Sequence, residues 1–148
     1  MKRNSRKKAR ANVIRVRTWT HAQAQSAQPY LASVVRSVRE HFLEAIRGHN
    51  RVQQLSKDHG RPNRESIIAL AEAQREFDEA RQRFEDAENE LNELDVYVLD
   101  PVQGLALIPF EQDERLAWFV FELFDDEPLN SWRFQEDSLE TRRPIKAA

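Results

Sequence analysis

Hydrophobic residues recur with a helical period through much of the first half of the chain. From about Pro29 to Lys57, apolar side chains return at alternating steps of four and three residues, which predicts one packed stripe of a long helix. The stripe consists of Leu31, Val35, Val38, Phe42, Ala45, His49 and Val52. Gly60 supplies a helix stop, and Pro62 or Asn63 begins the next element.

A second helix is predicted from about Asn63 to Leu94, where an unbroken heptad pattern of the coiled-coil type contains no Gly or Pro. Its seam is Leu70, Ala73, Phe77, Ala80, Phe84, Ala87, Leu91 and Leu94. Folding the chain at the Gly60–Pro62 turn places the two stripes against each other in an antiparallel hairpin. This register pairs His49 with Ala73 and Phe42 with Ala80, so that each phenylalanine meets a small or β-branched residue.

After Asp95 the period changes from helical to extended, with β-branched and aromatic residues separated by turn signals. The predicted strands are 96–99, 105–110, 116–123 and 129–134. We therefore expect an α+β fold: a long antiparallel helical hairpin (29–57 and 63–94), a small three- to four-stranded antiparallel sheet (96–134) and a C-terminal segment (135–148). Residues 18–145 form one domain in this interpretation.

The strand around Trp118 is apolar on both of its faces. Trp118 points one way, and Phe119 and Phe121 point the other. Since one face can pack on the hairpin, the other needs the C-terminal segment, a second copy of the chain or a partner. We expect Trp118, Phe119, Phe121 and Trp132 to form a surface for a partner or for self-association.

The charge of the chain is divided unevenly. The 148 residues carry 23 Lys/Arg and 25 Asp/Glu, for a net charge of −2. Residues 1–17 hold eight of the basic residues and none of the acids, which leaves a net charge of about −10 on the remainder. Such a block predicts a disordered basic tail that could bind RNA phosphates. The candidate contacts are Lys2, Arg3, Arg6, Lys7, Lys8 and Arg10.

Several classes of function find no support in the residues. The chain has no cysteine, so we expect neither disulfides nor thiolate chemistry, and a cytoplasmic location. No apolar run is long enough to span a membrane, and the basic N-terminus lacks the apolar stretch of a secretory signal. Nucleophile motifs and glycine-rich phosphate loops are missing. We therefore expect no cofactor and no small-molecule ligand of known type, and an enzymatic activity ranks last among the functions considered.

Two kinds of side chain were considered as chemical candidates. The four histidines do not have the spacing of a helical metal site, and His49 lies within the packing stripe, so a structural role and no metal are expected. Glu122 is a lone acid in an apolar strand, for which an ion pair with Arg133 or Arg142 would be a structural explanation. The acidic turn Asp125–Glu127 has no spacing that demands a bound cation.

Short motifs are spread over residues 18–145. They are Asp100-Pro101, Gly104-Leu105, Phe110, an apolar strand, Trp132, Arg142-Arg143-Pro144-Ile145, a Thr opening a short helix, and Pro29-Tyr30-Leu31 at the head of a long one. In these motifs the sequence resembles an uncharacterised prokaryotic family, domain of unknown function 2203. The family tends to show Cys-Trp where this chain has Val120-Phe121, and Trp-His where it has Trp132-Arg133. The resemblance implies the fold, and the family has no assigned activity to transfer.

Two functions remain open. The first is a non-catalytic protein-interaction or self-associating module, with the hairpin as a stalk and the aromatic sheet as the binding surface, which predicts a homo-oligomer or a protein complex insensitive to salt. The alternative is an RNA- or ribosome-associated accessory protein that acts through the basic tail, with binding that weakens steeply as salt rises.

Overall fold

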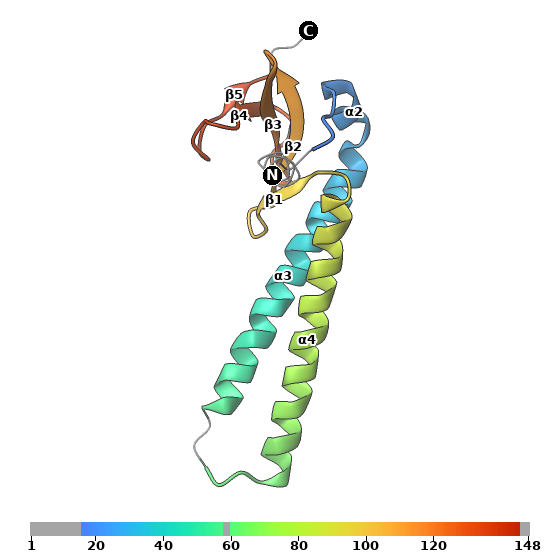
Figure 1. Ribbon diagram of the computed structural model, residues 1–148. Coiled ribbons are helices and arrows are strands. Elements are labelled where there is room, and N and C mark those ends of the chain that lie inside the picture. The colour runs from blue at the N-terminus through green and yellow to red at the C-terminus, as the bar shows by residue number, and fades with distance from the viewer. Residues whose placement is uncertain (1–15, 58–59, 146–148) are drawn as a thin grey trace, which may run out of the picture.

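A computed structural model describes residues 16–57 and 60–145. It has an α+β architecture in which a long helical hairpin carries a small antiparallel sheet at one end (Figure 1). The elements are α2 (His21–Ser26), α3 (Gln28–Ser56), α4 (Arg64–Asn92), β1 (Tyr97–Asp100), β2 (Leu105–Gln112), β3 (Arg115–Glu122), β4 (Ser131–Phe134) and β5 (Arg143–Pro144). The predicted fold class is confirmed. We call the hairpin the stalk and the sheet with α2 the head.

Local sequence signals explain where the helices begin. Thr20 caps α2 through a reciprocal pair of hydrogen bonds with Gln23, and Pro29 lies in the first turn of α3, where its missing N–H costs nothing. Asn63 caps α4 in the same reciprocal way with Ser66. The observed helices therefore begin and end within two residues of the predicted bounds.

The register of the hairpin differs from the predicted one by about one turn. Phe42 packs against Phe84 with ring centroids 5.3 Å apart, and His49 packs against Phe77 at 5.4 Å. The expected pairing of phenylalanines with alanines was therefore wrong at these positions. The physical reason is that α4 begins farther from the head than α3 ends (Figure 1), so the two helices are not symmetric about the Gly60–Pro62 turn.

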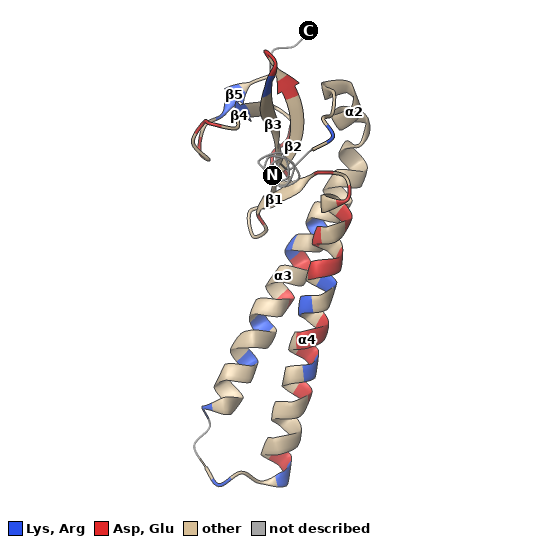
Figure 2. Ribbon diagram, in the orientation of Figure 1, with Lys and Arg blue, Asp and Glu red and all other residues tan. Residues whose placement is uncertain are grey.

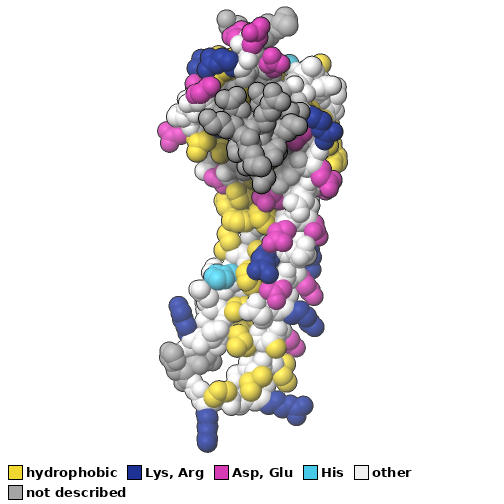
Figure 3. All heavy atoms as spheres, in the orientation of Figure 1, with side chains coloured by type: hydrophobic (Ala, Val, Ile, Leu, Met, Phe, Trp, Pro, Cys, Tyr) yellow, Lys and Arg dark blue, Asp and Glu magenta, His cyan; other side chains and the backbone are white. Residues whose placement is uncertain are grey.

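Burial in the stalk is concentrated next to the head. The buried residues of α3 are Leu31, Val34, Val35 and Val38, all in its N-terminal half. Farther out, the buried positions of α4 are the small residues Ala73 and Ala80. Ile67 and Ile68 near the far end are 60% and 47% exposed, and Figure 3 shows hydrophobic side chains at the surface there. The two helices of the outer stalk are thus held together by a narrow row of buried side chains.

Charge supports the pairing of the helices. Acidic residues dominate α4, whereas the charged residues of α3 are mostly basic (Figure 2). Among the described residues, two ion pairs cross the stalk: Arg51 lies 3.7 Å from Glu76, and Arg83 lies 3.6 Å from Glu44. Their side chains are roughly half exposed, so each pair contributes little alone.

The sheet is an antiparallel meander in the order β1-β2-β3-β4-β5. Asp113 and Glu114 both have positive φ and form the two-residue turn between β2 and β3. The prediction of three or four strands omitted β5, which has two residues and pairs with β4 through Ser131 and Trp132. Because a two-residue strand has no alternating pattern, periodicity could not reveal it.

Both faces of the sheet are covered by apolar side chains. The inner face, which includes Ile108, Phe119 and Phe121, packs into the core formed with α2, α3 and α4. On the outer face, Leu107, Trp118 and Val120 form a second buried cluster, flanked by partly buried residues that include Tyr97. The C-terminal segment contributes to this face, since the Trp118 indole N–H donates to the side chain of Gln135.

The lone acid of the apolar strand has the structural role expected for it. Arg142 Nε lies 3.2 Å from Glu122 Oε1 in a partly buried ion pair. Arg133, the other predicted partner, is buried and instead donates from Nη1 to the carbonyl oxygens of Phe134 and Asp137.

Among residues 16–57 and 60–145, no helix combines the length and the hydrophobicity that crossing a bilayer requires.

Candidate functional site

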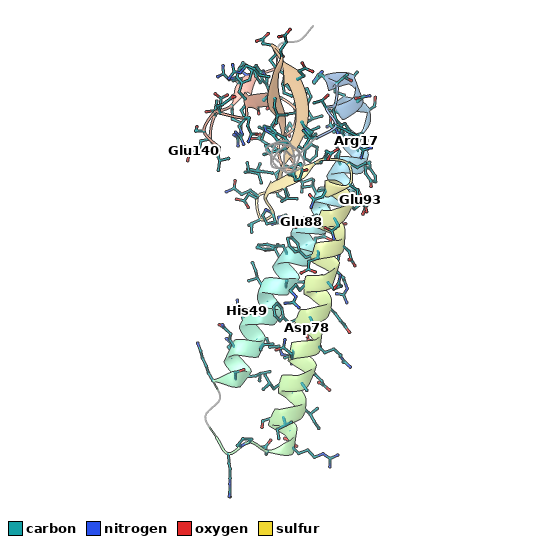
Figure 4. All side chains as sticks on the ribbon, in the orientation of Figure 1. Arg17, His49, Asp78, Glu88, Glu93 and Glu140 are labelled. Carbon is teal, nitrogen blue, oxygen red and sulfur yellow. The ribbon has the colours of Figure 1, made fainter. Side chains whose placement is uncertain are left out.

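An N-terminal segment, Thr18–His21, lies along one side of the head. The backbone N–H of Trp19 donates to the Pro109 carbonyl at 2.7 Å, which places the segment beside β2. The Trp19 indole donates to the Leu94 carbonyl at 3.1 Å. Just before it, Arg17 binds the end of α4 and the turn that follows, through the Glu93 carbonyl at 2.6 Å and the Asp95 carboxylate at 3.0 and 3.1 Å (Figure 4). The segment is therefore fixed to both stalk and sheet.

Aromatic rings form the floor between this segment and the far edge of the sheet. The rings of Phe110 and Phe119 are stacked, with centroids 3.9 Å apart and planes 6° from parallel. Trp132 meets the Phe110 ring edge-on at 5.6 Å, and His21 lies 5.6 Å from Phe119 on the opposite side. The β-sheet register explains this gathering, because Phe119 pairs with Trp132 and their side chains share the inner face.

The opposite wall is β5 with Ile145. Arg143 pairs with Trp132 in the sheet, and its guanidinium lies 5.4 Å from the Trp132 ring and 4.9 Å from the Phe134 ring. The backbone N–H of Ile145 donates to the Asn130 carbonyl at 3.1 Å. This wall is consequently held by its own backbone and by the rings beneath it.

Asp137 fixes the orientation of the Arg143 guanidinium. Arg143 Nε and Nη2 donate to the two carboxylate oxygens of Asp137 at 2.8 and 2.9 Å. These bonds, followed by the backbone N–H of Phe134, lower the pKa of Asp137 to about 2. The same contact raises the pKa of Arg143 above its usual value. Nη1 of Arg143 has no hydrogen-bond partner among the described residues.

Together these parts enclose an open pocket of about 900 Å³. It is lined by Thr18, Trp19, Thr20, His21, Phe110, Glu111, Gln112, Phe119, Trp132, Arg143, Pro144 and Ile145. Glu111 and Arg143 are the charged side chains in this lining. Strand alternation directs Glu111 to the face opposite Phe110, so Arg143 is the charge presented on the pocket's own face.

The pocket offers both apolar and polar groups to a ligand. The partly exposed rings of Trp19 and Trp132 offer flat apolar surface, and Thr18 and Gln112 add polar groups to the lining. His21 Nε2 is buried without a hydrogen-bond partner, and within the described residues no hydrogen bond connects His21 to a hydroxyl or carboxylate. A nucleophile–base pair of the usual geometry is therefore not assembled in this part of the chain.

The structure separates the four aromatic residues predicted to form one surface. Phe119 and Trp132 come together in the pocket. Trp118 lies on the outer face with 7% of its surface exposed, and Phe121 is fully buried in the main core. Whether any of them binds a partner stays a prediction. The candidate tail residues Lys2, Arg3, Arg6, Lys7, Lys8 and Arg10 lie outside the described residues.

The sequence did not predict Trp19, His21, Arg143 or Ile145 as site residues. A usable signal was present in the motifs that carried the family resemblance, because Phe110, Trp132 and Arg143-Pro144-Ile145 all line the pocket. Their spacing along the chain gives no reason to place them together, and only the strand pairing does so.

The stalk has a smaller groove of about 300 Å³ between α3 and α4. Its lining is mostly charged and includes Glu44, Arg51, Glu76 and Arg83, which pair across the stalk as described above. The ion pairs between the two helices explain the charged lining of this groove. In the part of the chain that the structure describes, no three acidic or histidine side chains are grouped as metal ligands.

Comparison with known proteins gave one match. The model of a family described as an uncharacterized conserved protein, DUF2203, matches residues 17–145. The comparisons with curated proteins and with solved structures found no match.

Proposed function

Because the chain belongs to the uncharacterized conserved family DUF2203, we propose its function from its geometry: it is a non-catalytic interaction module that binds a protein partner through the aromatic pocket of the head. The hairpin serves as a stalk, and the head lies at one end of this stalk. The cytoplasmic location expected from the sequence stays a prediction.

The observation that carries this proposal is the pocket itself. Its volume of about 900 Å³ falls within the range of about 300–1,000 Å³ typical of ligand sites. Trp19, Trp132 and Ile145 line it while remaining partly exposed. Tryptophan and arginine are the residue types most enriched among those that dominate protein–protein binding energy.

The manner of binding follows from the edge of the sheet next to the pocket. An extended partner strand added to β5 would need backbone donors, and Pro144 has no N–H to give. A partner is therefore better held by side chains inserted into the pocket than by continuation of the sheet. A second copy of the chain is one such partner, which would make the protein a homo-oligomer.

The proposal can be tested by affinity capture from the native organism's lysate with matched variants. Trp132→Ala removes a pocket ring, and Phe124→Ala removes an aromatic that is 66% exposed elsewhere on the head. We expect one protein, or the chain itself, to be captured by the wild type and by Phe124→Ala and lost with Trp132→Ala. Direct binding of that protein must then be measured by calorimetry with purified components, after circular dichroism shows that both variants are folded.

The alternative function is RNA or ribosome association through the basic tail. Two further measurements distinguish it from binding at the pocket: capture with a shortened chain and capture at several salt concentrations. A version lacking residues 1–15 keeps Arg17, which binds Asp95, and therefore leaves the described fold intact. Capture that vanishes in this version and weakens steeply with salt would favour the tail. Capture that is unchanged by the deletion and by salt, but lost with Trp132→Ala, favours the pocket.

A further inference from the structure

The chemistry of the pocket lining indicates which part of a partner it would bind. This inference rests on the proposed function. The pocket lining combines a broad aromatic surface with two charged residues, Arg143 and Glu111, of which strand alternation directs the Glu111 side chain to the opposite face of the sheet. An occupant that complements both features has a large apolar group and an anion close to it.

Arg143 is held ready for an anion. Two of its nitrogens bind Asp137, and the guanidinium is fixed over the rings of Trp132 and Phe134. Nη1 is left without a partner among the described residues, on a side chain that is 44% exposed. A guanidinium whose orientation is already set loses little entropy when it binds a carboxylate.

Asp137 reduces the net charge at this position, yet it does not remove the anion preference. Its two carboxylate oxygens are occupied by Arg143 and by the Phe134 N–H. The Arg115 guanidinium lies 3.9 Å from the centroid of the same Phe134 ring and interacts favourably with the Asp137 charge, while its Nη2 is paired with Glu136 at 2.8 Å. Glu111, the acid in the lining, belongs to the opposite face of β2.

We propose that the pocket binds the free C-terminus of a partner polypeptide that ends in an aromatic residue. The terminal ring packs between Trp19 and Trp132, and the terminal carboxylate accepts a hydrogen bond from Arg143 Nη1. The Thr18 and Gln112 side chains, which make no hydrogen bond within the described part of the chain, also line the pocket and are available to the last peptide groups. A chain terminus satisfies the geometry better than an internal segment, because one residue supplies both the ring and the anion.

The experiment compares two peptides that differ only at the terminal group. N-acetyl-Gly-Leu-Phe is used with a free carboxylate and as its C-terminal amide, and binding to the full-length protein is measured by calorimetry. We expect the free acid to bind about tenfold or more tightly than the amide, as a charge-assisted hydrogen bond predicts. Equal affinities would overturn the proposal.

Variants of the protein test whether Arg143 causes the preference for the free acid over the amide. Arg143→Gln should bring the two affinities within about twofold of each other. The control Arg39→Gln removes a guanidinium that lies over Phe124, away from the pocket, and should keep the full preference. Because Arg143→Gln could loosen β5, Arg143→Lys is included: it keeps the charge and should retain part of the preference. A preference for the acid that survives in Arg143→Gln contradicts the proposal.

Further outcomes distinguish a polypeptide terminus from a small aromatic acid as the ligand, and distinguish failure of this inference from failure of the proposed function. If free N-acetylphenylalanine binds as tightly as the tripeptide acid, the ligand is a small aromatic acid and the assignment to a polypeptide terminus falls. If the peptides show no preference but Trp132→Ala still loses a captured protein, this inference fails while the interaction module stands. If neither peptide binds and no capture depends on Trp132, both proposals fail.

Discussion

At the scale of single residues, the glycine that precedes β2 has the most demanding environment. Gly104 has φ of +67°, a conformation that side chains with a Cβ rarely adopt. A Cβ added there would lie 2.7 Å from Leu123 Cβ, which is fixed next to the backbone. The Leu123 N–H also donates to the Gly104 carbonyl at 3.0 Å, so the two strand ends cannot move apart freely.

Gly104→Ala should therefore destabilise the protein by roughly 2–4 kcal/mol, from the left-handed backbone and the steric overlap together. Urea unfolding followed by circular dichroism measures the change. Gly60→Ala is the matched control, because Gly60 has nothing within 4 Å of an added Cβ and no positive φ. Its stability should change by less than about 0.5 kcal/mol. Similar losses in the two variants would contradict the steric explanation.

The ion pair behind the pocket wall makes a pH-dependent contribution. The pKa of Asp137 is lowered to about 2, mainly by the hydrogen bonds from Arg143. A carboxyl group whose pKa is lower in the folded state stabilises the fold above its unfolded pKa of about 4. That stabilisation is lost as pH falls through about 4 to 2, where the group becomes protonated in both states.

We expect wild type to be more stable than Asp137→Asn at pH 5, and the difference to shrink toward zero as pH approaches 2. Urea midpoints of the two proteins at several pH values measure it. A difference that stays constant over this range would show that the Asp137 charge is not what holds β5.

At the scale of elements, the helices were easier to predict than the way they pair. Pro29 lies in the first turn of α3 and Asn63 caps α4, so the helix starts followed from local chemistry. The expected stop at Gly60 was wrong in detail, because α3 ends at a C-cap on Lys57. The register did not follow from local chemistry, because a heptad stripe places an apolar residue at every turn, so that it fits its partner almost equally well after a shift of one turn. The close approach at Gly48, whose added Cβ would lie 3.1 Å from Phe77 Cα, is consistent with the observed register.

The observed register can be tested in solution by a double-mutant cycle. Phe42→Leu and Phe84→Leu should be coupled by about 0.5–1.5 kcal/mol, because their rings are 5.3 Å apart. Phe42→Leu and Phe77→Leu should be additive, since Phe77 packs against His49. The predicted but unobserved register would give no coupling between Phe42 and Phe84.

At the scale of the whole molecule, the sequence left the pocket unpredicted for a simple reason. Its walls come from residues 18–21, from residues of β2, β3 and β4, and from the segment 143–145, which are brought together only by tertiary structure. The sequence correctly indicated an apolar sheet after the hairpin, including the ion-paired Glu122. It could not indicate which of the aromatic side chains stay partly exposed.

Stalk and head should also be separable in function. Deleting residues 43–56 and 64–77 removes two heptads from each helix and only one buried position, Ala73. We expect the shortened chain to unfold cooperatively and to bind the tripeptide acid within about twofold of the wild type. Calorimetry and thermal melting measure both properties. Loss of cooperative unfolding would mean that the outer stalk supports the head.

The hydrogen bonds of Arg17 and Trp19 have a consequence for the order of folding. Every strand pairs with its neighbour in sequence and the two long helices are consecutive, so these units can form early by closing short loops. Trp19 instead reaches Pro109 and Leu94 across most of the chain. The N-terminal wall of the pocket leaves the ribosome first and should dock last. Pulse-labelling hydrogen exchange should therefore protect the Trp19 amide after the amides of β2 and β3.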